Sequence, residues 1–355
     1  MVLNKALAPF ETSTSIPYLP GPNNPETQPN VCISLLGEVR VWLQREETRI
    51  AVPIHSYRRQ ELLAYLATMA PTREHRVSSG RIITDVFEHI APGSDVENLR
   101  GLFQKHTQLL RKELNEAAQQ FQFPPISLFQ FEKVDNSSTK WWLSPECRVV
   151  DLPAVRQAHR RLETFKESGS QDLEQMRAAC EQVIALYREG GGDYLEKHLL
   201  QDDFGDTRWV REPFTEYREM YLQALWDGAV AEHNQLLAVI STPDRYRAAK
   251  KAAALYRSYA LYAPKNRNFT ISVKKTVRQS ERALRGYLRI CQWLLDAQAA
   301  DTSYALYERQ MRREFPEWKP EKTTIELLQT LRQQSSTSLQ QGSVLPQFVE
   351  GEEHV

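Results

Sequence analysis

The sequence predicts a mainly α-helical protein made of two folded units, an α+β unit over residues 31–150 and an all-α unit over residues 151–332. Two observations support this division. Runs that alternate apolar and polar residues are mixed with helical patterns up to residue 150, and helical patterns alone follow it. A length of 355 residues with 41% hydrophobic residues is typical of a globular chain with two or three domains.

The two ends of the chain lack the apolar residues of a folded core. Residues 1–30 contain six prolines among Ser, Thr and Asn. Residues 333–355 are rich in Gln and Ser and include Glu350, Glu352 and Glu353. Because such compositions bury too little surface to offset the entropy of ordering, they predict disordered tails over 1–30 and 333–355.

The first unit is predicted from its strand patterns, its helix caps and its turns. Ser56 can cap one helix and Asp95 another, and Asp135 begins a polar turn between two strand-like runs. In order, the expected elements are strands at 31–36, 39–43 and 49–53, helices at 56–69, 79–90 and 98–114, and a long β-hairpin at 126–149.

The second unit is predicted to be a series of helical hairpins, because short breaks between helices favour antiparallel neighbours. Residues 244–264 are similar to the second helix of a tetratricopeptide (TPR) unit, with small residues followed by Pro264, although the spacing is about one turn too long. The expected helices are 152–167, 171–189, 211–236, 243–262, 271–298, 302–315 and 321–332.

The helix over Asn98–Leu114 has two chemically different faces. One stripe is apolar and the other is cationic and hydrogen-bonding, and strands, a short helix and a hairpin surround it in the order that presents a helix to a DNA groove. The competing interpretation is a solvated surface helix. The residues expected to contact base edges are Arg100, Gln104, Lys105, Gln108 and Arg111, and those expected to contact the phosphate backbone are Lys112, Arg58, Arg59 and, from the hairpin, Lys140.

The overall charge and the remaining motifs narrow the functional class. Because 45 basic residues balance 45 acidic ones, nucleic-acid binding has to come from a local patch. Four scattered cysteines form no CxxC pair, and no phosphate-binding loop, zinc-protease or hydrolase motif is present. We therefore expect no enzymatic activity, no catalytic residues, no cofactor and no metal. The absence of an export signal and of a long apolar run predicts a cytoplasmic protein without a membrane anchor.

Six short motifs give the chain a resemblance to a known family. They are ISLLGEVRVW at 33–42, YRRQELLAYLA at 57–67, VSSGRIITDVF at 77–87, LLRKEL at 109–114, VVDLPAV at 149–155 and ALYERQMRREF at 305–315. In this order they resemble the bacterial regulators of the antibiotic regulatory protein (SARP) family. The resemblance covers residues 31–331. It implies an OmpR-type winged helix-turn-helix followed by a TPR-like bacterial transcriptional activator domain (BTAD).

The resemblance also implies partners and exposes a difference. Members of the family bind promoter repeats in double-stranded DNA, recruit RNA polymerase and associate as homodimers. This chain has Leu109 where such regulators usually have arginine, and Lys105 and His106 where threonine and tyrosine are common. An alternative is therefore a TPR-like adaptor whose winged helix no longer binds DNA.

Overall fold

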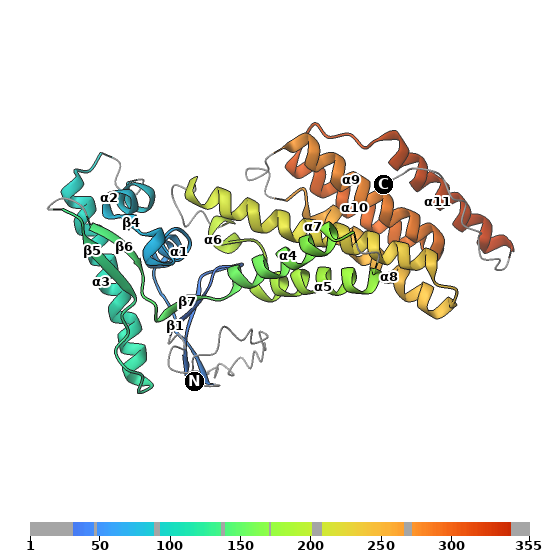
Figure 1. Ribbon diagram of the computed structural model, residues 1–355. Coiled ribbons are helices and arrows are strands. Elements are labelled where there is room, and N and C mark those ends of the chain that lie inside the picture. Colours follow the sequence, from blue (N-terminus) through green and yellow to red (C-terminus); the bar gives the residue numbers. More distant parts are fainter. Residues whose placement is uncertain are drawn as a thin grey trace, which may run out of the picture.

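The computed structural model describes residues 31–341, except 46–47, 89–92, 136–138, 170–171, 201–207 and 266–271. Within these residues the chain is mainly helical, with a small strand-containing region at its N-terminal end followed by helices (Figure 1). The prediction of a mainly α fold that begins with an α+β region is confirmed at this level. The expected tail over 1–30 and the last part of the other tail, 342–355, lie outside the described residues.

The first sheet has the strand order β3-β2-β1-β7. Its first three strands match the predicted ones and pair antiparallel. The fourth was expected to belong to the long hairpin over 126–149, but it leaves that hairpin and pairs in parallel with β1, placing Cys147 opposite Val31. The strands are β1 (Val31–Ser34), β2 (Arg40–Arg45), β3 (Thr48–Ala51) and β7 (Cys147–Val149).

Three helices and a second sheet follow β3. The second sheet has the order β4-β6-β5, so a short strand between two helices pairs with the hairpin. The elements are α1 (Tyr57–Met69), the 3-10 turn η2 (Arg73–His75), β4 (Val77–Ser78), α2 (Ser79–Ile82), the π-helical turn η3 (Ile83–Phe87), α3 (Val96–Gln120), β5 (Phe129–Lys133) and β6 (Thr139–Leu143).

The helices that follow residue 150 pack in sequence, as the short breaks predict: α4 on α5, α5 on α7, α7 on α8, and α8 on α9. The short helix α6 was not predicted. The helices of this region are α4 (Asp151–Glu167), α5 (Leu173–Gly190), α6 (Glu196–Leu200), α7 (Arg208–Ala238), α8 (Thr242–Tyr262), α9 (Val273–Leu294), α10 (Ala297–Glu314) and α11 (Lys322–Gln341).

Three helix boundaries near the C-terminal end differ from the prediction, and one of them is the start of α10 at Ala297 instead of residue 302. The helix expected to reach residue 298 ends at Leu294, because Leu295 adopts a left-handed conformation (φ 56°) and Asp296 caps the next helix. The last helix was expected to end at 332 and instead continues to Gln341. Gln is a good helix former, and Gln334 accepts a hydrogen bond from Gln292 of α9 at 2.9 Å. The tail predicted from 333 therefore begins as helix.

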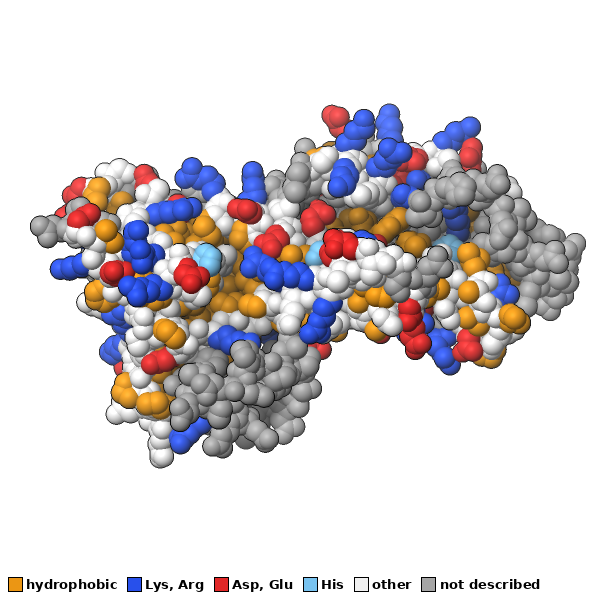
Figure 2. Space-filling model, viewed as in Figure 1, with side chains coloured by type: hydrophobic (Ala, Val, Ile, Leu, Met, Phe, Trp, Pro, Cys, Tyr) orange, Lys and Arg blue, Asp and Glu red, His pale blue; other side chains and the backbone are white. Residues whose placement is uncertain are grey.

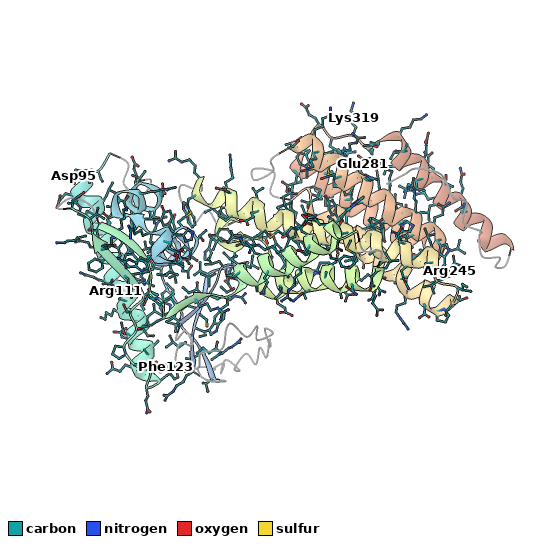
Figure 3. The ribbon with its side chains drawn as sticks, viewed as in Figure 1. Asp95, Arg111, Phe123, Arg245, Glu281 and Lys319 are labelled. Atoms are coloured by element: carbon teal, nitrogen blue, oxygen red, sulfur yellow. The ribbon has the colours of Figure 1, made fainter. Side chains whose placement is uncertain are left out.

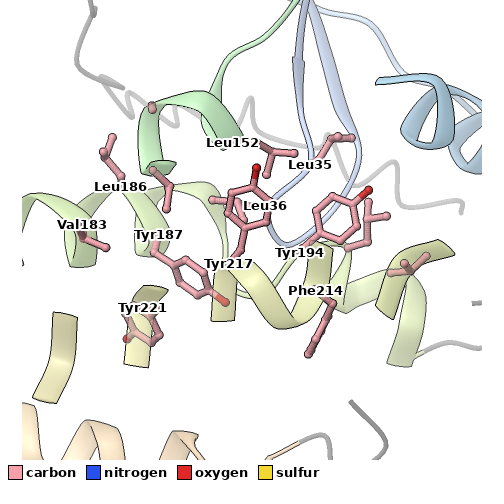
Figure 4. Packing of buried hydrophobic residues seen from close by; sticks show 14 of the residues in the cluster. Leu35, Leu36, Leu152, Val183, Leu186, Tyr187, Tyr194, Phe214, Tyr217 and Tyr221 are labelled. Atoms are coloured by element: carbon pink, nitrogen blue, oxygen red, sulfur yellow. The ribbon is translucent and has the colours of Figure 1, made fainter. Parts of the chain in front are cut away.

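The turn between β1 and β2 joins the first sheet to the helices. Asp151, the first residue of α4, accepts hydrogen bonds at Oδ2 from the Ser34 hydroxyl (2.7 Å) and from the backbone N–H groups of Leu35 (2.6 Å) and Leu36 (2.7 Å). Leu35 and Leu36 are fully buried, and Leu36 forms a β-bridge with Tyr194 (Figure 4). The sheet and the helices consequently share one hydrophobic core.

Gly37 lets this turn approach the segment after α5. Its φ of +73° lies in the left-handed region, and a Cβ there would lie 2.8 Å from the carbonyl oxygen of Gly191. The Gly37 N–H donates to the Asp193 carbonyl at 2.8 Å, and the Gly37 carbonyl accepts from the Lys197 N–H at 2.9 Å. A side chain at position 37 would break this close contact.

A buried ion pair lies on the other side of the same segment. The Arg218 guanidinium of α7 lies 3.1 Å from Asp193 Oδ2, and the two side chains are 5% and 0% exposed. Arg218 also donates to the carbonyl oxygens of Tyr262 (2.9 Å), Ala263 (3.0 Å) and Lys265 (2.5 Å). The last carbonyl groups of a helix have no hydrogen-bond donor within the helix. Arg218 therefore neutralises the Asp193 carboxylate and also donates hydrogen bonds to the free carbonyl groups at the end of α8.

Candidate nucleic-acid interface

The α3 helix begins where the sequence predicts and extends further than predicted. Asp95 Oδ1 accepts a hydrogen bond from the Asn98 N–H at 2.8 Å, which satisfies one of the free N–H groups at the helix start. The helix passes Leu114, its predicted end, and reaches Gln120, because buried Ala118 continues the apolar stripe. Figure 3 shows Asp95 at one end of this helix and Arg111 midway along it. At about 1.5 Å per residue, α3 is about 37 Å long.

The outward face of α3 carries five of the predicted contact residues. All five side chains are exposed: Arg100, Gln104, Lys105, Gln108 and Lys112. Arg100 lies 3.7 Å from Glu97 and Lys112 lies 3.7 Å from Glu116, and all four side chains are largely exposed. Such long, solvated pairs contribute little energy, so the cations can exchange these partners for an anionic ligand.

Arg111 packs between α3 and the hairpin instead of joining the outward face. Its guanidinium donates to the carbonyl oxygen of Phe129 at 3.3 Å and lies 5.8 Å from the centre of the Trp141 ring. Partial burial lowers the pKa of Arg111. The structure therefore does not place Arg111 with the other residues predicted to contact bases, and it gives this side chain a packing role.

The N-terminal end of α1 lies along one edge of α3. Arg59 lies 2.7 Å from Glu113 of α3, and Arg58 lies 2.7 Å from Glu61, which is buried. Both of these predicted phosphate contacts are already paired with carboxylates, so less of their charge is available to DNA. Burial and the nearby charges of Arg59, Lys105 and Arg58 lower the pKa of His106, which favours its neutral form.

The β5–β6 hairpin lies along the other edge of α3. Phe131 and Trp141 are opposite each other in the sheet, and the Trp141 ring lies 5.0 Å from the ring of Phe103 on α3. Because neighbouring residues in a strand point to opposite faces, Lys140 points away from α3. The Lys140 side chain, which was predicted to contact DNA, therefore lies on the opposite side of the sheet from α3.

Lys140 instead joins a second group of cations on the far face of this sheet. Arg73, Glu74 and Arg76 line a shallow depression together with Lys140. Arg73 lies 3.5 Å and Arg76 3.3 Å from Glu132. Arg73 and Arg76 are not among the predicted contact residues, because nothing in their local sequence shows that they reach the hairpin.

Lys133 is the hairpin cation that lies on the α3 side. It is opposite Thr139, two residues from Phe131 along the same strand, and therefore points to the same face as Phe131. The Lys133 side chain is exposed, and Phe131 is 53% exposed. Alternation along the strand selects Lys133 instead of Lys140 only once it is known that Trp141, and not Trp142, faces α3. The candidate interface thus consists of the outward face of α3 with Lys133 and Phe131 at its edge.

Other chemistry is sparse in the part of the chain that the structure describes. None of its residues form a cluster of three or more His, Cys, Asp or Glu able to hold a metal ion. The four cysteines are buried and free, and burial raises the pKa of Cys32 to about 11 and of Cys147 to about 12, so both remain thiols near neutral pH. No helix over the described ranges is long and apolar enough to cross a membrane.

We compared the chain with known protein families, curated proteins and solved structures. No known protein family, curated protein or solved structure matches the chain. The function is therefore inferred from the residues and their placement.

Proposed function

We propose that residues 31–150 form a winged helix-turn-helix unit that binds double-stranded DNA, and that the chain is a transcriptional regulator. The element order supports this proposal. The short strand β4 follows α1 in the chain and precedes α2 and α3. It forms one sheet with the β5–β6 hairpin that comes after α3. This arrangement is expected when α3 is a recognition helix and the hairpin is a wing.

The observation that carries the proposal is the outward face of α3. Gln104 and Gln108 are exposed one helical turn apart, and a Gln side chain can pair with the N6 and N7 atoms of adenine in the major groove. Lys105 and Lys112 on the same face can neutralise phosphates or contact guanine. The major groove is about 12 Å wide and admits a single helix of this kind.

The proposed role in transcription extends to the helical unit. Resemblance to the SARP family implies that the protein is an activator whose TPR-like domain mediates homodimerisation and contact with RNA polymerase. Successive packing of α4, α5, α7, α8 and α9 supports a scaffold of stacked helical hairpins. Such scaffolds commonly present a surface to a protein partner.

A second candidate function is a protein-interaction adaptor that does not bind DNA. Three of the arginines predicted to contact DNA favour it, since Arg58 and Arg59 are paired with carboxylates and Arg111 packs on Trp141. The zero formal charge of the chain is compatible with the same alternative.

Selection of DNA fragments separates the two candidates. Purified protein incubated with fragmented genomic DNA is expected to enrich a small set of duplexes with a shared sequence. Binding to an enriched duplex should weaken with salt, with a slope of log K against log salt of about −0.9 for each phosphate neutralised. An adaptor would enrich no duplex, and that result would exclude the proposed DNA-binding function.

A further inference from the structure

The outward face of α9 carries a row of cations that the proposed DNA interface does not use. Its members are spaced one to seven residues apart and fall within about 100° of the helix circumference. All are exposed: Lys274, Lys275, Arg278, Arg282 and Arg289. We call these five residues the α9 cationic row. Figure 2 shows many Lys and Arg side chains, with some Asp and Glu among them, over the part of the molecule that contains α9.

The α9 cationic row has no acidic partner among the described residues. Glu281, the acidic residue of α9, and Glu321, which directly precedes α11, are engaged elsewhere. Glu281 is buried and accepts hydrogen bonds from the Glu321 N–H at 2.5 Å and the Thr324 hydroxyl at 2.8 Å. Glu321 itself lies 2.7 Å from Arg285, which is on the same face of α9, between Arg282 and Arg289 along the helix, but is only partly exposed. Apart from Arg285, the cations on this face have no ion pair with a described residue; their mutual repulsion is electrostatically costly, and an anionic ligand would relieve this cost.

One member of the row is held in place by an aromatic ring. The Arg282 guanidinium lies 5.2 Å from the centre of the half-buried Trp226 ring on α7. Trp226 in turn contacts Tyr256 and Tyr259 of α8, with ring centres 5.8 and 5.7 Å apart. This stacking limits the conformations of Arg282 before a ligand arrives, and a preorganised guanidinium loses less entropy on binding a carboxylate.

The spacing of the row fits an extended peptide. Lys274, Arg278 and Arg282 follow one another at intervals of four residues, about 6 Å along a helix. In an extended chain, every second side chain points to the same face, at intervals of about 6.7 Å. Acidic residues at alternate positions can therefore meet successive members of the row.

The DNA proposed for α3 does not explain this surface. The α3 and α9 helices lie toward opposite ends of the molecule (Figure 1). A duplex that lies along α3 leaves α9 free for a different partner. We propose that the α9 cationic row binds an extended acidic segment of a partner protein, with carboxylates at alternate positions.

Peptide binding by the full-length protein tests this proposal. The probe is a fluorescein-labelled peptide of about fifteen residues in which glutamate alternates with serine, which matches the spacing of the row. Its control has glutamine in place of glutamate. By fluorescence anisotropy at low salt, the glutamate peptide is expected to bind and the glutamine peptide is not, because the attraction is electrostatic and weakens with added salt.

Charge-neutralising variants locate the site. The variant Lys274→Gln, Lys275→Gln, Arg278→Gln is expected to bind the glutamate peptide at least about fivefold more weakly, since each exposed ion pair contributes only a modest energy. The matched control Arg160→Gln, Arg161→Gln, Arg247→Gln removes the same charge from exposed positions on α4 and α8 and should bind within about twofold of the parent protein.

Three results would overturn the proposal. In the first, the glutamate peptide fails to bind. In the second, the control variant loses as much affinity as the α9 variant, so only net charge matters. In the third, the α9 variant loses affinity for random-sequence duplex DNA and not for the peptide, which would assign the row to nucleic acid. Binding of the selected duplex through α3 is measured separately, so a failure of either proposal is distinguishable from a failure of the other.

Discussion

Replacing Gln104 and Gln108 together by alanine is expected to lower the affinity for the selected DNA site by about 100-fold, because each lost bidentate base contact costs about 1–3 kcal/mol and 1.4 kcal/mol is a factor of ten. Both side chains are exposed, so the substitution leaves the core of the first unit intact. Affinity for random-sequence duplex should change little, since the phosphate contacts remain. Titration of both duplexes at one salt concentration measures the two effects.

The same helix offers a matched control. Gln119→Ala with Gln120→Ala makes the same chemical change at exposed positions in the last turn of α3. This control should bind the selected site as tightly as the parent protein. If the two double variants bind equally well, the outward face of α3 does not contact bases.

Asp193→Ala is expected to lower the free energy of unfolding by about 3–5 kcal/mol, because removing one member of a buried ion pair leaves the other charge buried without its counter-ion. The remaining charge is that of Arg218, whose side chain is 5% exposed. The substitution also removes the carboxylate that accepts the hydrogen bond from the Tyr187 hydroxyl. Chemical denaturation followed by circular dichroism measures the change.

An exposed ion pair in the same region provides the comparison. Lys197 and Glu38 form an ion pair with side chains that are 57% and 39% exposed. Glu38→Ala should cost less than about 1 kcal/mol, since solvent screens such pairs. Equal losses from Asp193→Ala and Glu38→Ala would show that burial of the Asp193–Arg218 pair is not what makes it important.

Local signals in the sequence predicted most of the elements. The Asp95 cap defines the start of α3 because capping depends on one side chain and the N–H groups of the next turn. The buried positions Leu99, Phe103, Leu110 and Leu114 follow from the helical period alone. The exposed row on the opposite face of α3 follows from the same period.

Long-range pairing was the part that the sequence could not reveal. The parallel contact between β7 and β1 joins residues more than a hundred positions apart, and nothing in the sequence of 147–149 distinguishes it from the rest of the hairpin. The partners of Arg58, Arg59 and Arg111 also depend on long-range packing. The local sequence around an arginine does not show whether its side chain faces solvent or contacts another part of the protein.

The side of the sheet on which Lys140 lies also depended on information that the sequence lacks. The register of β5 and β6 places Lys140 on the face away from α3 and places Lys133 toward α3. The side of a residue in a strand follows from whether it is an odd or even number of positions from a known core residue. Trp141, which packs on Phe103, provides that reference once the structure shows which of the two adjacent tryptophans faces α3.

Photo-cross-linking from α3 tests the central proposal most directly. A photoreactive benzoylphenylalanine replaces Gln108 on the outward face, and in a second protein it replaces Gln119 near the end of the same helix. With the selected duplex bound, irradiation is expected to attach position 108 to bases within the shared sequence, because a recognition helix lies in the major groove. Position 119 should give little or no DNA product. If the bound protein gives no DNA cross-link from position 108, α3 does not lie in the groove.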